Sequence, residues 1–306
     1  MNKCMDDSLV VSVCMITYNH EAYISQAIDG ILMQKTTFKY ELVLSDDCST
    51  DNTRIICEEY CKKYPDLIKN VSPKKNLGAL GNSFECLSSC SGKYIAICEG
   101  DDYWIDPLKL QKQVDFLEKN VDYGMCYTKA KHYYQSKMKF RSKDRGGANE
   151  SFIDFLRKNT VPTLTVVFRT DLYHEYLKEI MPEKRGWSMG DYPLWLWIAY
   201  NSKIKFLPEV TGVYRILLDS ASHSSAFEKN VAFVKSTFDI KEFFYKKYPQ
   251  QEISIDDIQQ ELYQRLFSLS FSFRRKDCLK KYYKLIKRKT FSVYVKFWIR
   301  RFFWGI

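Results

Sequence analysis

The chain has 306 residues, with 47 Lys/Arg against 37 Asp/Glu and a formal net charge of +10 at pH 7. Its 22 Tyr and 20 Phe indicate a large buried core, which excludes a disordered protein. The charge is concentrated at one end: residues 271–306 contain 12 basic residues and one acid, whereas residues 1–270 contain 35 basic and 36 acidic residues, so we expect no nucleic-acid partner.

The ten cysteines and the N-terminus both favour a cytoplasmic location. No CxxC spacing occurs, and Cys14, Cys98 and Cys126 lie inside apolar runs, as reduced core thiols do. The first seven residues lack the basic start and apolar run of a signal peptide. No uncharged apolar stretch of about 18 residues is present, so we expect no membrane-spanning helix.

The first half of the chain alternates between strand and helix patterns. Short connections between these segments predict an α/β fold whose mostly parallel sheet is flanked by helices. Strands are predicted at residues 9–17, 40–45, 67–71 and 95–99, and helices at 22–33, 53–63, 83–89 and from Asp106-Pro107 to 117.

Two of these predicted strands end in clusters of acids. Asp46 and Asp47 follow one strand, and Glu99, Asp101 and Asp102 end the other. Open α/β sheets bind ligands at the carboxyl ends of their strands, and neighbouring acids repel unless a cation or donors offset them. Hard oxygen ligands suit Mg²⁺ or Mn²⁺, which suit phosphate groups. A solvated acidic turn is the alternative for either cluster alone, but two clusters in one α/β unit favour a site.

The end of the first strand is the third candidate. Thr17, Asn19 and Glu21 are polar residues at and just after that end, where such sheets bind ligands. For Thr17 and Asn19, simple turn chemistry explains the residues equally well.

The next segments continue the fold. Residues 127–134 and 163–169 are predicted strands and residues 152–157 a short helix. The polar stretch 135–150 is predicted to be a flexible loop of the length that functional lids have. His132 and His174 have no partner at ligand spacing, so we interpret them as structural.

A second chemical centre is predicted around Asp191. Gly190 permits a tight turn before it, and an apolar helix follows. Trp187, Tyr192 and Trp195 would partly desolvate the carboxylate and raise its pKa toward that of a general base. The alternative is that Asp191 only caps the helix.

The tail is helical from residue 227, with a second helix at 255–273 and a basic aromatic end. Two domains are therefore predicted, residues 1–225 and 226–306. On a helix, one face would carry Phe291, Tyr294, Val295, Trp298, Ile299 and Phe302, and the opposite face Lys289, Lys296 and Arg300. This pattern is typical of a helix lying in the surface of an anionic membrane. The alternative is packing on the body or in a dimer or other oligomer.

Four motifs in register carry a family resemblance. Residues 11–19, 46–53, 76–78 and 92–102 resemble family 2 glycosyltransferases of the GT-A fold, of the bacterial surface-polysaccharide type, and the resemblance covers about residues 9–225. The family's DxD motif stands here as Glu99-Gly100-Asp101. The resemblance implies a Rossmann-like GT-A domain, here followed by a helical C-terminal extension.

The resemblance also implies an activity. It is metal-dependent transfer of a sugar, with Mn²⁺ or Mg²⁺ as cofactor, from a nucleotide diphosphate-sugar to a saccharide acceptor. We expect a UDP-sugar donor, a lipid-linked acceptor and a role in capsule, exopolysaccharide or lipopolysaccharide assembly. A single displacement would invert the anomeric carbon. The enzyme would be peripheral on the inner face of the cell membrane.

The resemblance assigns roles to individual residues as well. Asp191 would be the general base that deprotonates the acceptor hydroxyl. Asp101 would hold the metal, with Glu99 near the ribose or in the metal shell, and His223 would complete the metal shell or bind phosphate. Asp46 or Asp47 would contact the nucleotide base, and Arg215 would contact the diphosphate. Asp102 would bind sugar hydroxyls or cap a turn. Thr17, Asn19 and Glu21 would line the nucleotide pocket.

Two other functions compete with this one. A nucleotidyltransferase also uses a metal and acids on an α/β sheet, but residues 9–21 lack a Gly-rich, basic triphosphate loop. A membrane-attached subunit that binds saccharide or nucleotide-sugar without catalysis would not need the intact acids Asp47, Asp101 and Asp191.

Overall fold

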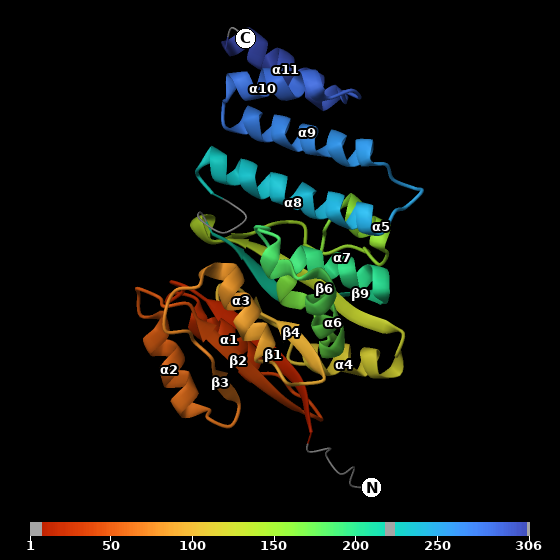
Figure 1. Cartoon of the computed structure of the whole chain (residues 1–306). Helices are drawn as coiled ribbons and strands as arrows, with labels where there is room; N and C mark the ends of the chain where they lie inside the picture. The colour runs from red at the N-terminus through yellow and green to blue at the C-terminus, as the bar shows by residue number, and fades with distance from the viewer. Residues whose placement is uncertain (1–7, 218–223, 305–306) are drawn as a thin grey trace. The chain divides into compact units, whose positions relative to one another are not determined.

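The computed structural model describes residues 8–217 and 224–304 (Figure 1). The chain forms two compact units, Met1–Lys184 with Gly190–Ile216 and Arg185–Met189 with Leu217–Ile306. The division at residue 225 that the sequence suggests stays a prediction.

A sheet flanked by helices forms the centre of the first unit, as predicted, and its strand pairing is mixed. Its strands lie in the order β3-β2-β1-β4-β8-β6-β9-β5, with β7 paired to β6. Pairing is parallel from β3 to β4 and between β6 and β9, and antiparallel elsewhere. The strands are β1 Leu9–Thr17, β2 Lys39–Asp46, β3 Ile68–Asn70, β4 Tyr94–Ile97, β5 Tyr103–Trp104, β6 Tyr123–Tyr134, β7 Lys139–Phe140, β8 Val167–Arg169 and β9 Lys203–Ile216.

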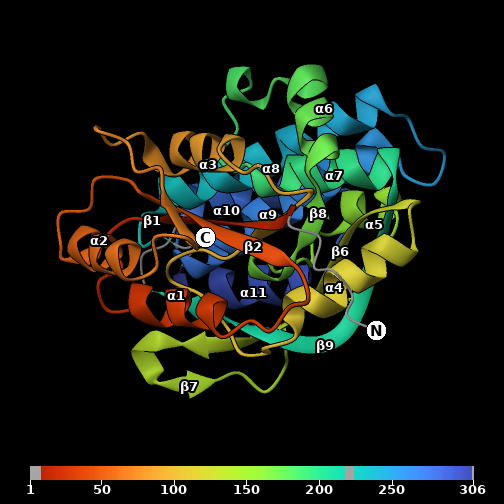
Figure 2. The same cartoon turned by 90° about the horizontal axis from the view of Figure 1, so that it is seen from below.

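Helices cover both faces of this sheet. Figure 2 shows α3, α6 and α7 on one side of the strands and α1 and α4 on the other. Because both faces are covered, the central strands are mostly apolar, and Val11, Val13, Leu42 and Ile95 are fully buried. The helices are α1 Ile24–Leu32, α2 Thr53–Lys63, α3 Gly78–Ser88, α4 Lys109–Lys119, α5 Phe152–Arg157, α6 Thr170–Ile180 and α7 Asp191–Asn201.

Two predicted helix starts and one predicted strand are corrected. α3 begins at Gly78 instead of residue 83. α4 begins at Lys109 because Asp106 and Pro107 form a turn, in which Asp106 Oδ1 accepts the Leu108 N–H. The predicted strand 163–169 begins with a 3-10 turn, Thr163–Thr165, and only Val167–Arg169 is strand.

The stretch 135–150 is more ordered than predicted. It contains a 3-10 turn at Gln135–Lys137 and strand β7, so that Tyr133 faces Phe140 across a β-hairpin. Arg145 then returns to form a bridge with Ala130. Aromatic cross-strand pairing and the resumed backbone hydrogen bonds explain why this segment is not an irregular loop.

The second unit consists of helices and one short loop. Its helices are α8 Phe227–Lys247, α9 Ile255–Ser272, α10 Lys276–Leu285 and α11 Phe291–Trp304. Ser254 and Asp257 start α9 with a capping box. Loop Arg185–Met189 belongs to this unit because Trp187 packs edge-on against Phe243 with ring centroids 5.4 Å apart, and the Ser188 N–H donates to Ser236 Oγ at 2.7 Å.

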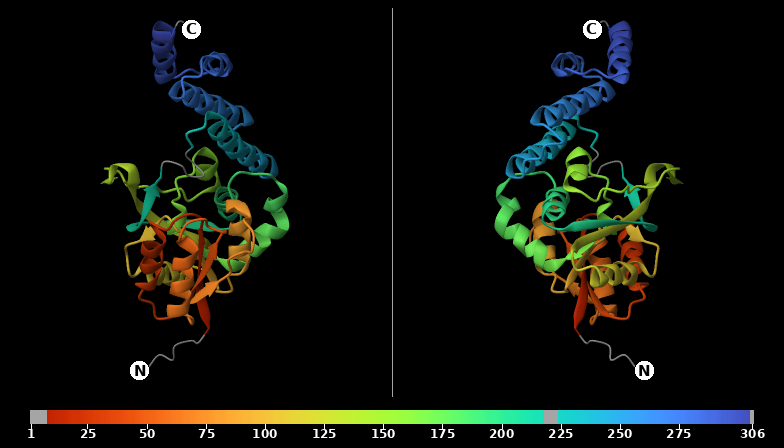
Figure 3. Two further views of the ribbon diagram at one scale, coloured as in Figure 1. Left: turned by 90° about the vertical axis from the view of Figure 1, so that its left-hand side faces the viewer. Right: turned by 90° about the vertical axis from the view of Figure 1, so that its right-hand side faces the viewer.

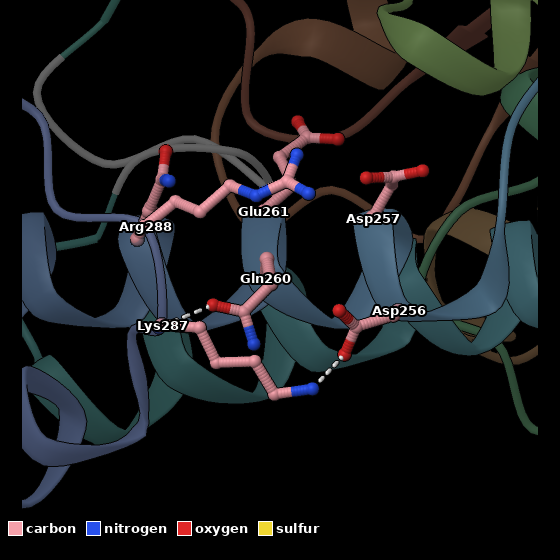
Figure 4. A pocket seen from close by; sticks show the side chains of 7 residues that line it. Asp256, Asp257, Gln260, Glu261, Lys287 and Arg288 are labelled. Atoms are coloured by element: carbon pink, nitrogen blue, oxygen red, sulfur yellow. Dashed lines mark hydrogen bonds and ion pairs between the residues drawn. The ribbon is translucent and has the colours of Figure 1, made fainter.

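A polar pocket lies where the segment before α11 meets α9. Figure 4 shows Lys287 and Arg288 beside the acidic side of α9, where Asp256, Asp257 and Glu261 lie. Lys287 Nζ pairs with Asp256 Oδ1 at 2.6 Å, and the backbone N–H of Lys287 donates to Gln260 Oε1 at 2.7 Å. These contacts hold the start of α11 against α9, and none of the predicted site residues lines this pocket.

Helix α11 leaves most of its predicted apolar face exposed. Val293 is buried and Phe297 stacks on Tyr283 with ring centroids 3.7 Å apart, whereas Phe291, Tyr294, Val295, Trp298 and Ile299 are 37–83% exposed. The side chains of Arg300 and Phe302 lie outside the described part of the chain. Within that part, the structure contains no helix whose length and apolar character would let it span a bilayer.

Candidate active site

Three strand ends meet at one edge of the sheet. Thr17 at the end of β1 is in register with Asp46 at the end of β2. On the other side of β1, the Gly100 N–H donates to the carbonyl of Ile16 at 2.9 Å. The parallel strands therefore bring the two acidic clusters to either side of Thr17.

The glycine of the Glu99-Gly100-Asp101 motif is required by this arrangement. A Cβ atom at Gly100 would lie 2.5 Å from Thr17 Oγ1 and 2.7 Å from Thr17 Cβ. Only glycine allows the acidic turn to approach β1 so closely. The motif is thus built to hold its two acids against the end of a neighbouring strand.

The three acids after β4 have different environments. Glu99 Oε2 is buried and has no hydrogen-bond partner among the described residues. Burial, followed by the charge of Asp101 and a smaller effect of Asp191, raises the Glu99 pKa to about 8. Burial and the charges of Asp101 and Glu99 also raise the pKa of Asp102, although its Oδ1 accepts the Arg215 N–H at 2.7 Å. Asp101 is partly exposed, and its carboxylate accepts no hydrogen bond from the described part of the chain.

Arg215 holds this acidic turn in place. Its guanidinium is buried, donates to the Asp101 carbonyl and to Gln26 Oε1, and lies between the rings of Tyr23 and Tyr103 at 4.9 and 4.6 Å from their centroids. These contacts are with the protein itself. The structure therefore places Arg215 at the acidic turn, and its predicted contact with a diphosphate stays a prediction.

The acids after β2 are also engaged by the protein. Asp46 is fully buried and accepts hydrogen bonds from the backbone and side chain of Ser49. Asp47 Oδ1 accepts the Leu77 N–H at 2.7 Å, and its carbonyl accepts from Asn76 Nδ2 at 2.8 Å. Each carboxylate retains further acceptor capacity, which leaves either acid able to receive a donor from a nucleotide base.

Asn19 and Glu21 connect two loops. Asn19 Oδ1 accepts the Thr50 N–H at 2.8 Å, and Glu21 Oε2 accepts the backbone and side-chain donors of Asn52 at 3.0 and 2.8 Å. Asn19 itself has a positive φ of 56°, which asparagine tolerates better than most residues. The turn chemistry considered for Asn19 is thus present, and a nucleotide contact of either residue stays a prediction.

The predicted base Asp191 is the first residue of α7. It is partly exposed, and its Oδ2 accepts a hydrogen bond from Thr163 Oγ1 at 2.8 Å. The aromatic residues expected around it are engaged elsewhere: the Tyr192 hydroxyl donates to the carbonyl of Phe155, and Trp187 belongs to the second unit. Since its charge acts on Glu99, Asp191 lies in the same electrostatic neighbourhood as the acidic turn.

Sequence reasoning missed three contributors. His20 Nδ1 lies 3.1 Å from Thr17 Oγ1, and burial lowers its pKa against the opposing charges of Asp101 and Asp51. The positive charge of Arg145 acts to lower the pKa of Glu99, and the Thr163 hydroxyl donates a hydrogen bond to Asp191. His20 lies three residues after the end of β1, a position that could have marked it as a site candidate. Arg145 and Thr163 are distant from the acidic clusters in the sequence. The predicted His223 lies outside the described residues.

The carboxylates fit a divalent cation that completes its shell with a substrate. Within residues 8–217 and 224–304, no three His, Cys, Asp or Glu side chains are placed to hold a metal by themselves. However, Mg²⁺-type ions are commonly held by one or two carboxylates together with substrate phosphates and water. The unpartnered Glu99 Oε2 and the accessible Asp101 carboxylate supply oxygen donors of this kind.

Comparison with known proteins adds the family. A family model described as glycosyl transferase family 2 matches residues 12–180. Rv1520 of Mycobacterium tuberculosis, an uncharacterized protein, is 34% identical over 218 residues, which are 70% of this chain and 61% of Rv1520. The chain therefore spans about three-fifths of that relative's length.

Two further proteins are similar over parts of their sequence or in structure. The Escherichia coli protein WfgD, named a UDP-Glc:α-D-GlcNAc-diphosphoundecaprenol β-1,3-glucosyltransferase, is 40% identical over 116 residues, which are 38% of this chain and 44% of WfgD. The crystal structure of S. aureus TarS 1–349 with UDP-GlcNAc has a TM-score of 0.62 and 19% identity, and the match covers 91% of this chain and 82% of TarS. The predicted fold is thereby confirmed.

Proposed function

Because the chain belongs to glycosyltransferase family 2, we propose that it transfers a sugar from a nucleotide diphosphate-sugar to a saccharide acceptor in the assembly of a surface polysaccharide. The observation that carries this proposal is the acidic turn Glu99–Asp102, held at the sheet edge within electrostatic reach of Asp191. Such a turn suits a diphosphate with its cation, and Asp191 suits an acceptor hydroxyl.

Asp191 is the proposed general base. It would take the proton of the acceptor hydroxyl as that oxygen bonds to the anomeric carbon of the donor. The bond between the anomeric carbon and the diphosphate oxygen breaks in the same displacement, so the configuration inverts. Asp191 Oδ2 accepts from Thr163 and Oδ1 accepts the Tyr192 N–H at 2.7 Å, which keeps the carboxylate in one orientation, and each oxygen retains a further lone pair for the substrate.

Asp101 is the proposed ligand of a divalent cation, with Glu99 beside it and His223 as a further candidate. Bound Mn²⁺ or Mg²⁺ would supply charge neutralisation to the departing nucleotide diphosphate. A cation here would also favour the ionised form of Glu99, against the burial that raises its pKa. Arg215 would keep the turn in position and is a candidate for contact with the diphosphate.

The nucleotide would lie along the ends of β1 and β2. Asp46 or Asp47 would accept a donor of the base, with Thr17, Asn19 and Glu21 around it. WfgD is named for UDP-glucose and the TarS crystal structure contains UDP-GlcNAc, which supports a UDP-sugar donor. WfgD is also named for an acceptor on diphosphoundecaprenol, which supports a lipid-linked acceptor for this chain.

Helix α11 is the proposed membrane contact. Its exposed Phe291, Tyr294 and Trp298 form an apolar face beside a strongly basic segment, as in helices that lie in a bilayer surface. A peripheral position on the inner face of the cell membrane would bring the active site to a lipid-linked acceptor.

Ligand-induced thermal stabilisation tests the donor site. We expect one nucleoside diphosphate from a panel to raise the melting temperature of the full chain only when Mn²⁺ is present, because a ligand of the folded state stabilises it by mass action. Asp101→Ala should lose the shift, and Asp115→Ala, an acid on the exposed side of α4, should keep it. No shift with any nucleotide, in wild type and Asp101→Ala alike, would contradict the proposal.

A further inference from the structure

One hairpin concentrates positive charge within the first unit. Residues 129–145 contain seven Lys/Arg and one acid, whereas the rest of residues 1–270 contains 28 basic and 35 acidic residues. None of the seven forms an ion pair with an acid among the described residues. The segment is therefore a concentrated and uncompensated positive surface on an otherwise acidic domain. We call residues 129–145 the basic hairpin.

The basic hairpin projects from the edge of the sheet. β7 pairs with the end of β6, and in the left view of Figure 3 the yellow-green tip extends beyond the rest of the first unit. Lys137, Lys139, Arg141 and Lys143 are exposed, and so is Phe140, at 46%. Cations that repel one another on an exposed hairpin are costly to stability, which favours a binding role over a structural one.

The register of the hairpin arranges its cations as a row that leads to the active site. Lys139 pairs with Tyr134, and the Arg141 N–H donates to the carbonyl of His132, so both residues belong to the hairpin face that carries His132. Arg145, opposite Ala130, is on the same face.

Arg145 is where this row meets the catalytic acids. Its guanidinium lies 4.8 Å from the centroid of the Tyr214 ring, next to Arg215 on β9. It also acts electrostatically on Glu99. The row therefore begins at the acidic turn and ends at the exposed tip of the hairpin.

We propose that the basic hairpin binds the acceptor, and that this acceptor is an anionic saccharide carrying phosphodiester or carboxylate groups. Lysine and arginine heads recognise both groups, and arginine can bind them with two parallel hydrogen bonds. The exposed ring of Phe140, on the opposite face of the hairpin from Lys139 and Arg141, suits the face of a sugar ring. This inference rests on the proposed glycosyltransferase function and extends it to the class of acceptor.

An acceptor fits the hairpin better than a lipid headgroup does. A membrane surface needs cations gathered with an apolar insertion face, which α11 offers. In the basic hairpin, the cations instead follow a strand toward the catalytic acids, which matches an extended chain whose end reaches Asp191.

Hydrogen–deuterium exchange of the full chain tests this assignment. The probes are short-chain inorganic polyphosphate, polygalacturonate, neutral dextran, and vesicles of equimolar phosphatidylglycerol and phosphatidylcholine. We expect either anionic polymer to slow exchange in peptides covering residues 129–145, and dextran and vesicles to leave those peptides unchanged. Peptide resolution separates the hairpin from the basic tail at 274–300.

Two matched variants measure the hairpin's share of binding. Lys139→Gln/Arg141→Gln/Lys143→Gln removes three hairpin charges and leaves Arg145 in place. The control Lys35→Gln/Lys62→Gln/Lys119→Gln removes three exposed charges elsewhere in the first unit. We expect the hairpin variant to bind the anionic polymer at least about fivefold more weakly than the control, since each exposed charge contact contributes modestly.

The outcomes are distinguishable. Protection confined to the tail, or equal loss of binding in both variants, would overturn the proposal, and protection of the hairpin by vesicles alone would make it a lipid surface instead. Both variants should keep the manganese-dependent nucleotide shift. A protein without that shift, in which the hairpin still binds the polymer, would refute the proposed function and leave the anion site intact.

Discussion

Lys109 provides a sharp test of the electrostatics beneath the acidic turn. It is the first residue of α4 and is fully buried, and its Nζ has no hydrogen-bond partner among the described residues. The ammonium lies 4.1 Å from the centroid of the Trp104 ring. Burial lowers its pKa to about 7, and nearby Cys126, Cys98 and Asp106 oppose this only in part. A cation at a helix N-terminus is also disfavoured by the helix dipole.

The magnitude follows from the pKa difference between the folded and unfolded states. An unfolded lysine has a pKa of about 10.4, so the folded protein binds fewer protons than the unfolded chain between pH 7 and about 10.4. Stability therefore rises with pH in this window, by up to about 1.4 kcal/mol per unit. Because folded Lys109 is half deprotonated at pH 7, it should account for about 2 kcal/mol between pH 7 and 9. Below pH 7 Lys109 is protonated in both the folded and the unfolded state, so the full cost of burying its charge lowers the free energy of unfolding.

The assay compares wild type with Lys109→Met in urea at several pH values. Unfolding is followed by pulsed hydrogen exchange in peptides from β1 and β4, which report on the first unit alone. Relative to Lys109→Met, wild type should gain stability as the pH rises through this window. Lys112→Met, an exposed lysine paired with Asp106 on the same helix, should run parallel to wild type. Parallel curves for wild type and Lys109→Met would refute the reasoning.

Three other predictions concern the site and the tail. Asp191→Asn should lower turnover about a hundredfold to ten-thousandfold, because it removes the general base. The nucleotide-dependent shift in melting temperature should be kept. Loss of this shift as well would place Asp191 in donor binding. Gly100→Ala should cost about 1–3 kcal/mol in urea unfolding and weaken nucleotide binding, whereas Gly147→Ala, whose added Cβ would have its nearest contact at 3.7 Å, should be near wild type. Trp298→Glu should weaken sedimentation with phosphatidylglycerol vesicles about tenfold. The control Val121→Glu replaces an apolar residue of the first unit that is more exposed than Trp298, and it should leave sedimentation unchanged. Equal effects of the two changes would argue against a membrane role for α11.

The sequence predicted the fold well where the pattern is local. Buried strands such as Leu9–Thr17 and amphipathic helices such as Thr53–Lys63 carry their period in neighbouring residues, and the structure confirms both. The start of β6 at Tyr123, ahead of the predicted residue 127, and the 3-10 turn Thr163–Thr165 depend on tertiary contacts, among them the Trp104 indole donating to the carbonyl of Leu164. Such contacts leave no periodic signal.

The same distinction explains the site. Acids at strand ends are visible in the sequence because parallel topology brings strand ends together. Arg145 and Thr163 reach the acids from segments that are distant along the chain, and no local pattern marks them. Arg215 was found as a residue, but its engagement with the Asp101 carbonyl and two tyrosine rings required the structure.

The loop Arg185–Met189 has a consequence for how this protein can be divided. Its Trp187 and Ser188 take their partners from α8, yet the chain re-enters the first unit at Gly190 and begins α7 with Asp191. The two units are thus interleaved along the chain rather than consecutive.

A truncated protein ending at residue 216 would keep every strand of the sheet. It would lack α8, against which the loop Arg185–Met189 packs, and this loop ends two residues before Asp191. The tail is therefore not a removable module, and a chimera that exchanges it with a relative's tail must exchange the loop as well. Evolution at α8 and at residues 185–189 should be coupled for the same reason, since a change on one side alters the surface that the other must match.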